Sequence, residues 1–93
     1  MNRKEIETKL RLEGYPFVYH WKDAPNTHYP EHTHKDKVVL YTLSGSISMI
    51  FKNHTTVLTE GSRFEVPPQT LHQATVGLGG WECVYGEMIE GDA

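Results

Sequence analysis

The pattern of apolar and polar residues changes after residue 14. Within residues 3–13, Ile6 and Leu10 recur at helical spacing among charged residues, which predicts a short amphipathic helix. Gly14 ends this pattern, and Pro16 prevents the helix from resuming. We therefore expect residues 1–14 to form an N-terminal helical extension, followed by one domain at residues 15–93.

The rest of the chain has the pattern of an all-β protein. Aromatic and β-branched segments, separated by glycine, proline and asparagine, predict strands at residues 17–21, 38–43, 46–51, 55–60, 63–66, 71–76 and 81–89. Residues 22–31 contain two prolines and no period, so we expect a loop there, and turns at residues 44–45 and 77–80. Because no helix separates the strands, we expect a small antiparallel jelly-roll β-barrel.

The segment 38–43 is apolar on both sides. Alternate side chains of a strand point to opposite faces, so Val38, Leu40 and Thr42 oppose Val39, Tyr41 and Leu43. If the first set faces the barrel interior, the second set needs cover from a second sheet or from another subunit. A homodimer is the form that we expect, and it would supply the second kind of cover.

Composition excludes several classes of function. The 93 residues fit one domain with a modest core, and a formal net charge of −3 gives no broad positive field for binding nucleic acid. Cys83 is the only cysteine, so no intrachain disulfide can form, and we expect a buried structural thiol. No apolar run is long enough for a signal peptide or a membrane span. We expect a cytoplasmic protein whose partner is a small molecule.

Two histidines carry the candidate chemistry. His32 and His34 are one residue apart, so in an extended segment their side chains point to the same side. Imidazole is a common metal ligand, and His72, at the start of a later strand, is the best candidate for a third one. A His-x-His pair in a polar loop is more often simply solvated, so the pair alone leaves both interpretations open.

The spacing around these histidines resembles the first motif of the cupin superfamily. That motif runs glycine, five residues, His-x-His, three or four residues, glutamate, six residues and glycine. Here Asn26 stands at the first glycine, His32 and His34 at the histidines, Val38 at the glutamate and Gly45 at the last glycine.

The second cupin motif is matched with the same spacing. It runs glycine, five residues, Pro-x-Gly, two residues, histidine, three residues and asparagine. Gly61, Pro67 and His72 match, whereas Gln69 replaces a glycine and Val76 replaces the asparagine. Six of the ten signature positions are kept without a gap, and the resemblance implies a small jelly-roll barrel.

The resemblance also implies a divalent metal held by His32, His34 and His72. Val38 cannot coordinate, so the family's usual carboxylate ligand is missing, and the site is either a three-histidine centre or a decayed one. Zinc, iron, nickel and manganese remain open. Candidate substrate-binding residues are Leu40, Arg63, Trp81 and Tyr85, although Arg63 is more readily interpreted as a surface arginine on an edge strand.

The function implied is oxygenation or metal-assisted isomerisation of a small molecule, as in a metal-dependent oxidoreductase or isomerase. The alternative is a non-catalytic cupin that binds or senses a small ligand. The residues do not decide whether the protein is an enzyme.

Overall fold

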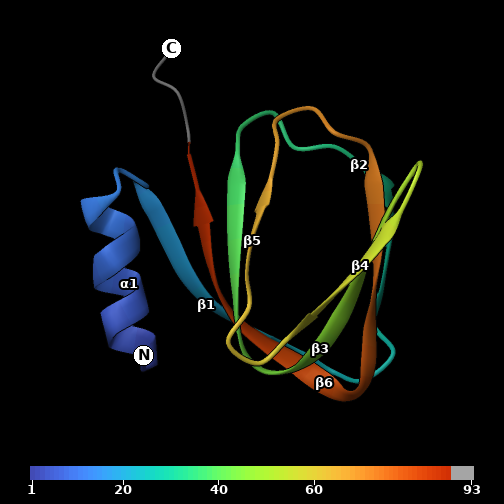
Figure 1. The fold of residues 1–93 in the computed structure, drawn as a ribbon, viewed down its shortest axis with the longest axis horizontal. Helices are drawn as coiled ribbons and strands as arrows, with labels where there is room; N and C mark the ends of the chain where they lie inside the picture. Colours follow the sequence, from blue (N-terminus) through green and yellow to red (C-terminus); the bar gives the residue numbers. More distant parts are fainter. Residues whose placement is uncertain (89–93) are drawn as a thin grey trace.

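The computed structural model describes residues 1–88 and holds one helix followed by six strands (Figure 1). The elements are α1 (Arg3–Leu12), β1 (Phe17–Asp23), β2 (His28–His32), β3 (Val38–Phe51), β4 (Thr55–Thr59), β5 (Arg63–Val66) and β6 (His72–Glu87). The helix begins after Asn2, whose side chain accepts a hydrogen bond from the Glu5 N–H while the Glu5 carboxylate accepts one from the Asn2 N–H. The predicted all-β jelly-roll class with a short N-terminal helix is confirmed.

Two long strands form the frame of the barrel. β3 and β6 pair antiparallel along their lengths, from Val38 opposite Glu87 to Phe51 opposite His72. β1 and β5 extend one half of this ladder, whereas β2 and β4 extend the other half. The two halves curve around a common interior (Figure 1), although the strand pairings within residues 1–88 do not close the sheet into a ring.

The predicted turns at residues 44–45 and 77–80 are wrong, because both segments lie inside the long strands. Gly45 has a φ of 74°, and a Cβ there would collide with the carbonyl group of Gly80. The glycines therefore allow two strands to bend and cross closely. A glycine in the sequence indicates a backbone conformation of this kind. It does not show whether the chain bends within a strand or reverses its direction. The end of the predicted strand 81–89 lies outside the described residues.

The predicted loop at residues 22–31 is also partly wrong. β1 continues to Asp23, and β2 begins at His28 despite Pro30. Proline lacks the N–H needed for a central strand but is tolerated at a sheet edge. β2 is such an edge, because β6 is its only strand partner among the described residues.

The helix supplies the cover that the apolar strand requires. Ile6 and Leu10 of α1 pack with Val39 and Tyr41 of β3 and with Val84 of β6. Leu10 and Val39 have no exposed surface. The outer face of β3 is therefore covered by a helix of the same chain, and neither a second sheet nor another subunit is needed there.

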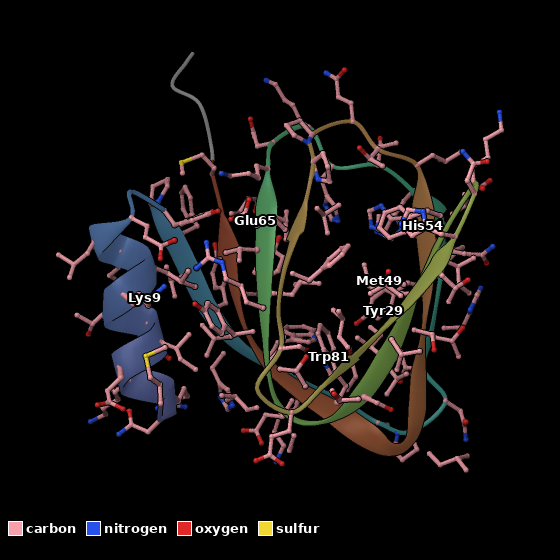
Figure 2. All side chains as sticks on the ribbon, in the orientation of Figure 1. Lys9, Tyr29, Met49, His54, Glu65 and Trp81 are labelled. Atoms are coloured by element: carbon pink, nitrogen blue, oxygen red, sulfur yellow. The ribbon has the colours of Figure 1, made fainter. Side chains whose placement is uncertain are left out.

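The opposite side of the sheet faces the barrel interior. Figure 2 places Tyr29, Met49 and Trp81 between the two halves of the sheet. Val38 and Leu40 of β3 belong to the same apolar cluster. In the part of the chain that the structure describes, no helix has the length and hydropathy that a membrane-spanning segment requires.

Candidate metal centre and ligand cavity

The structure brings His32, His34 and His72 together at one end of the barrel. His32 of β2 lies directly opposite His72 of β6 in the strand ladder, and His34 follows in the loop after β2. One nitrogen of each ring lies within 4.8 Å of those of the other two. The ring centroid of His32 lies 4.4 Å from that of His72 and 5.0 Å from that of His34.

Backbone hydrogen bonds fix two of the rings. Nδ1 of His32 lies 2.6 Å from the Pro30 carbonyl oxygen, and Nδ1 of His72 lies 2.8 Å from that of Thr70. A carbonyl oxygen only accepts, so each Nδ1 carries the hydrogen and donates it. The Nε2 lone pairs are therefore left for another partner, which is the usual arrangement of metal-binding histidines.

The surroundings of His34 favour its neutral form. Burial lowers the pKa of His34, and the neighbouring His32 and His72 lower it further. A neutral imidazole is the form that binds a cation. Zinc commonly takes nitrogen ligands of this kind, at about 2.0–2.1 Å. The donor set thus fits a divalent metal.

A turn from the second motif supports the loop that carries His34. The backbone N–H of Gln69 donates to the carbonyl oxygen of His34 at 2.7 Å. Gln69 has a φ of 56° and Asn26 a φ of 64°, and in residues 1–88 they are the non-glycine residues with a left-handed backbone. Both stand where the resembling motifs have glycine, so the two turns are kept although their glycines are replaced.

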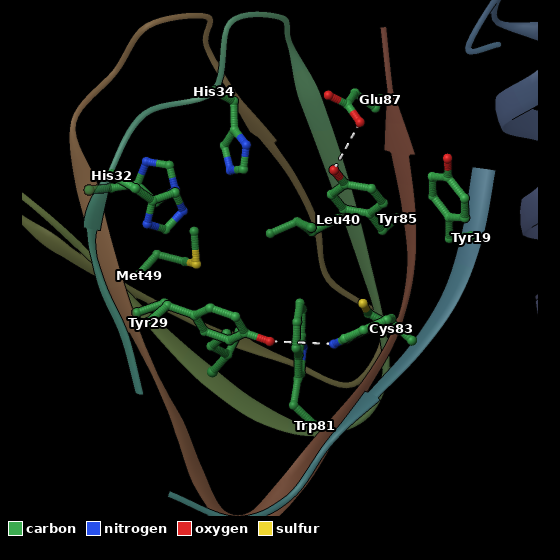
Figure 3. Close-up of a pocket in the computed structure, with 14 residues that line it drawn as sticks. Tyr19, Tyr29, His32, His34, Leu40, Met49, Trp81, Cys83, Tyr85 and Glu87 are labelled. Carbon is green, nitrogen blue, oxygen red and sulfur yellow. Dashed lines mark hydrogen bonds between the residues drawn. The ribbon is translucent and has the colours of Figure 1, made fainter. Parts of the chain in front are cut away.

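The histidines border a cavity of about 520 Å³ inside the barrel (Figure 3). Its other walls are mainly aromatic and apolar: Tyr19, Trp21, Tyr29, Leu40, Ile47, Met49, Ala74, Trp81, Cys83, Tyr85 and Glu87. Leu40, Trp81 and Tyr85, which the sequence marks as candidates for ligand contact, are therefore at the cavity wall. A mostly apolar pocket of this size is suited to a small molecule.

Arg63 lies outside this cavity. It pairs with Tyr41 in the β3–β5 ladder, on the side that α1 covers. Its guanidinium donates to Glu13 at 2.8 Å, to Glu65 at 2.9 Å and to the Tyr41 hydroxyl at 3.0 Å. We therefore assign no ligand contact to Arg63, and among the described residues no lysine or arginine lines the cavity.

Sequence reasoning missed several cavity residues. Cys83 and Glu87 share the parity of Tyr85 along β6, so strand alternation could have identified both. Tyr29 was missed because its segment was interpreted as a loop. Burial, followed by the charges of Asp23 and Glu82, raises the pKa of the Cys83 thiol to about 12, which keeps it protonated.

Several polar groups of the cavity wall already have partners. The Tyr29 hydroxyl donates to Asp23 at 2.7 Å, and the Trp21 indole donates to the same carboxylate at 3.0 Å. The Trp81 indole donates to the Thr42 hydroxyl at 3.0 Å. These groups hold the aromatic walls in place.

Three solved structures show the same fold. An RmlC-like cupin from Shewanella frigidimarina NCIMB 400 is 23% identical, with a TM-score of 0.66 over 80% of this chain and 67% of that one. KdgF from a Halomonas species is 16% identical, with a TM-score of 0.66 over 78% and 69%. The polyketide cyclase RemF from Streptomyces resistomycificus is 20% identical, with a TM-score of 0.66 over 77% and 54%.

These identities support a common fold and no more, and the chain spans about two thirds of the first two structures and about half of RemF. No curated protein sequence matches the chain. The family model described as a cupin domain matches residues 19–77, well over half of the chain. The protein therefore belongs to the cupin domain family.

Proposed function

We propose that this protein is a metal-dependent cupin that acts on a small, mostly apolar molecule. His32, His34 and His72 would hold a divalent cation. The observation that carries the proposal is their convergence, with the Nδ1 atoms of His32 and His72 donating to backbone carbonyls and leaving Nε2 for a metal.

The proposed reaction is oxygenation or isomerisation. A bound cation would supply a Lewis acid and open coordination positions, and neutral imidazoles suit zinc, iron and nickel, with manganese as a weaker alternative. Walls that include Leu40, Trp81 and Tyr85 would surround the reacting molecule with apolar and aromatic groups. A solved structure of the same fold is a polyketide cyclase, which agrees with catalysis on this architecture.

Calorimetric titration of Zn²⁺ into chelator-treated, untagged protein tests the metal site. We expect one cation per wild-type chain, and a loss of affinity of at least about 100-fold in His72→Ala. His28→Ala is the matched control, because His28 lies on β2, is exposed and hydrogen-bonds Thr75 outside the cavity. Wild-type protein without cation binding would refute the proposal and favour the non-catalytic ligand-binding module.

We also propose that two copies associate along β1. This strand lies at the edge of the sheet, and its Phe17, Tyr19 and Trp21 are 41%, 46% and 53% exposed. Unpaired strand edges with large apolar side chains favour pairing with another chain. Light scattering should detect a dimer that Phe17→Glu dissociates and Leu78→Glu, at another exposed apolar position, does not. A monomeric wild-type protein would contradict this arrangement.

A further inference from the structure

Glu87 is the one carboxylate among the described residues that line the cavity. It lies directly opposite Val38 in the β3–β6 ladder, and paired residues of neighbouring strands point to the same side of a sheet. Figure 3 shows its carboxylate at the end of the cavity where His34 lies. A carboxylate thus stands on the strand next to Val38, the position at which the first cupin motif has its glutamate.

The Tyr85 hydroxyl holds this carboxylate in place. It donates to Oε1 of Glu87 at 3.1 Å. Burial, followed by the charge of Glu87, raises the pKa of Tyr85 to about 12, so the phenol keeps its proton and remains a donor. The pair comes from alternate positions of one strand, which gives it a rigid support.

Glu87 also differs from the carboxylates outside the barrel. Glu13 and Glu65 form ion pairs with Arg63, and Glu82 pairs with His20. Within residues 1–88, Glu87 has no ion pair, and Tyr85 is its hydrogen-bonding partner among the side chains. Among the described residues, its charge is therefore not neutralised by a lysine or arginine.

Glu87 and His34 line the same end of the cavity (Figure 3). A carboxylate near a cation site favours the bound cation. The Glu87 oxygens do not belong to the set of ligand atoms within 4.8 Å of one another, so we do not count Glu87 as a direct ligand.

We propose that Glu87 is the charge-compensating carboxylate of the metal centre, held by Tyr85 at the end of the cavity where His34 lies. Three neutral imidazoles leave the full double charge of a divalent cation uncompensated, and Val38 cannot reduce it. Glu87 does so from the neighbouring strand. This inference rests on the proposed function, because it requires a cation at the three histidines.

Zn²⁺ calorimetry of Glu87→Gln tests the inference. We expect the dissociation constant to rise about 10- to 100-fold, the usual effect of removing a group that supports metal ligands. Glu60→Gln removes the same charge from an exposed turn and should change affinity less than about twofold. Thermal unfolding of the metal-free variants should show both folded, since glutamine keeps the size of glutamate.

Tyr85→Phe distinguishes this role from a merely structural one. It should weaken Zn²⁺ binding less than Glu87→Gln does, and it should have no further effect in the Glu87→Gln background, because the hydroxyl acts through the carboxylate. Additive effects of the two substitutions would contradict the coupling. If Glu87→Gln does not fold, Tyr85→Phe alone decides: weaker binding supports the inference, and unchanged binding overturns it.

The outcomes separate this inference from the proposed function. Wild-type affinity in Glu87→Gln, together with lost affinity in His72→Ala, overturns the role of Glu87 and leaves the three-histidine site standing. A wild-type protein that binds no Zn²⁺ overturns both.

Discussion

The two sides of β3 and β6 differ in how their charged groups are paired. On the outer side, α1 covers Val39 and Val84, and the charged groups around them are matched. Glu13 accepts hydrogen bonds from Arg63 at 2.8 Å and from Lys9 at 2.9 Å. On the inner side, the histidine cluster and Glu87 face a cavity that no lysine or arginine of the described chain lines.

The outer side therefore contributes to stability, and the inner side holds the groups that can bind a ligand. Outside, hydrogen bonds from Arg63, then from Lys9, lower the pKa of Glu13 to about 2, as expected of a carboxylate whose charge is already compensated. Inside, lone pairs and a negative charge are directed at open space, which is the arrangement of a ligand site. Substitutions on the outer side should therefore change stability without changing metal affinity.

Leu10→Ala should have the largest effect on the outer side. Leu10 is fully buried between α1 and the sheet, so its truncation should lower the free energy of unfolding by about 2–5 kcal/mol. Ile6→Val, at the same interface, should cost only about 0.5–1.5 kcal/mol. Urea unfolding of the metal-free proteins measures both, and Zn²⁺ affinity should stay within about twofold. A parallel loss of metal affinity would show that the two sides are not independent.

Glu13→Gln should reveal a pH-dependent contribution on the same side. The folded pKa of Glu13 is about 2 and its ordinary value is 4.5, so its contribution is fully present above pH 4.5 and disappears as pH falls toward 2. Wild-type protein should be more stable than Glu13→Gln at pH 7, and the difference should shrink between pH 5 and pH 3. Urea unfolding at each pH measures it. A difference that is constant with pH would contradict the pairing with Arg63.

Gln69→Gly should have the smallest effect, on the side of the metal centre. A left-handed backbone costs a non-glycine residue about 1–2 kcal/mol, and glycine loses about 0.5–1 kcal/mol through chain entropy. With a φ of 56° at Gln69, we expect a net gain in unfolding free energy of about 0.5–1 kcal/mol. Gln73→Gly, in β6, should destabilise instead. A lower free energy of unfolding in both Gln69→Gly and Gln73→Gly would mean that the turn depends on the Gln69 side chain.

The sequence predicts the parts of the molecule that depend on spacing. The separation of His32, His34 and His72 places three imidazoles on strands or loops that a jelly roll brings together, and in the structure one nitrogen of each lies within 4.8 Å of those of the others. The helix at the N-terminus follows from its apolar period and its end at Gly14. Its role does not follow, because no local pattern shows that α1 covers Val39 and Tyr41.

The features that sequence reasoning missed depend on contacts across the barrel. Gly45 predicts an unusual backbone, but only the close approach of Gly80 makes that position a bend inside a strand. Arg63 was a candidate for ligand contact until its register with Tyr41 placed it beside α1. Strand alternation alone places Glu87 on the side of Tyr85, but its position opposite Val38, far away in the sequence, appears only in the ladder.

The metal content of untagged protein, purified without chelators, tests the central claim most directly. Elemental analysis should find close to one divalent metal ion per wild-type chain and almost none in His72→Ala. His28→Ala should retain the metal, since His28 lies outside the cavity wall. The absence of metal from all three proteins, or its retention in His72→Ala, would contradict a three-histidine metal centre.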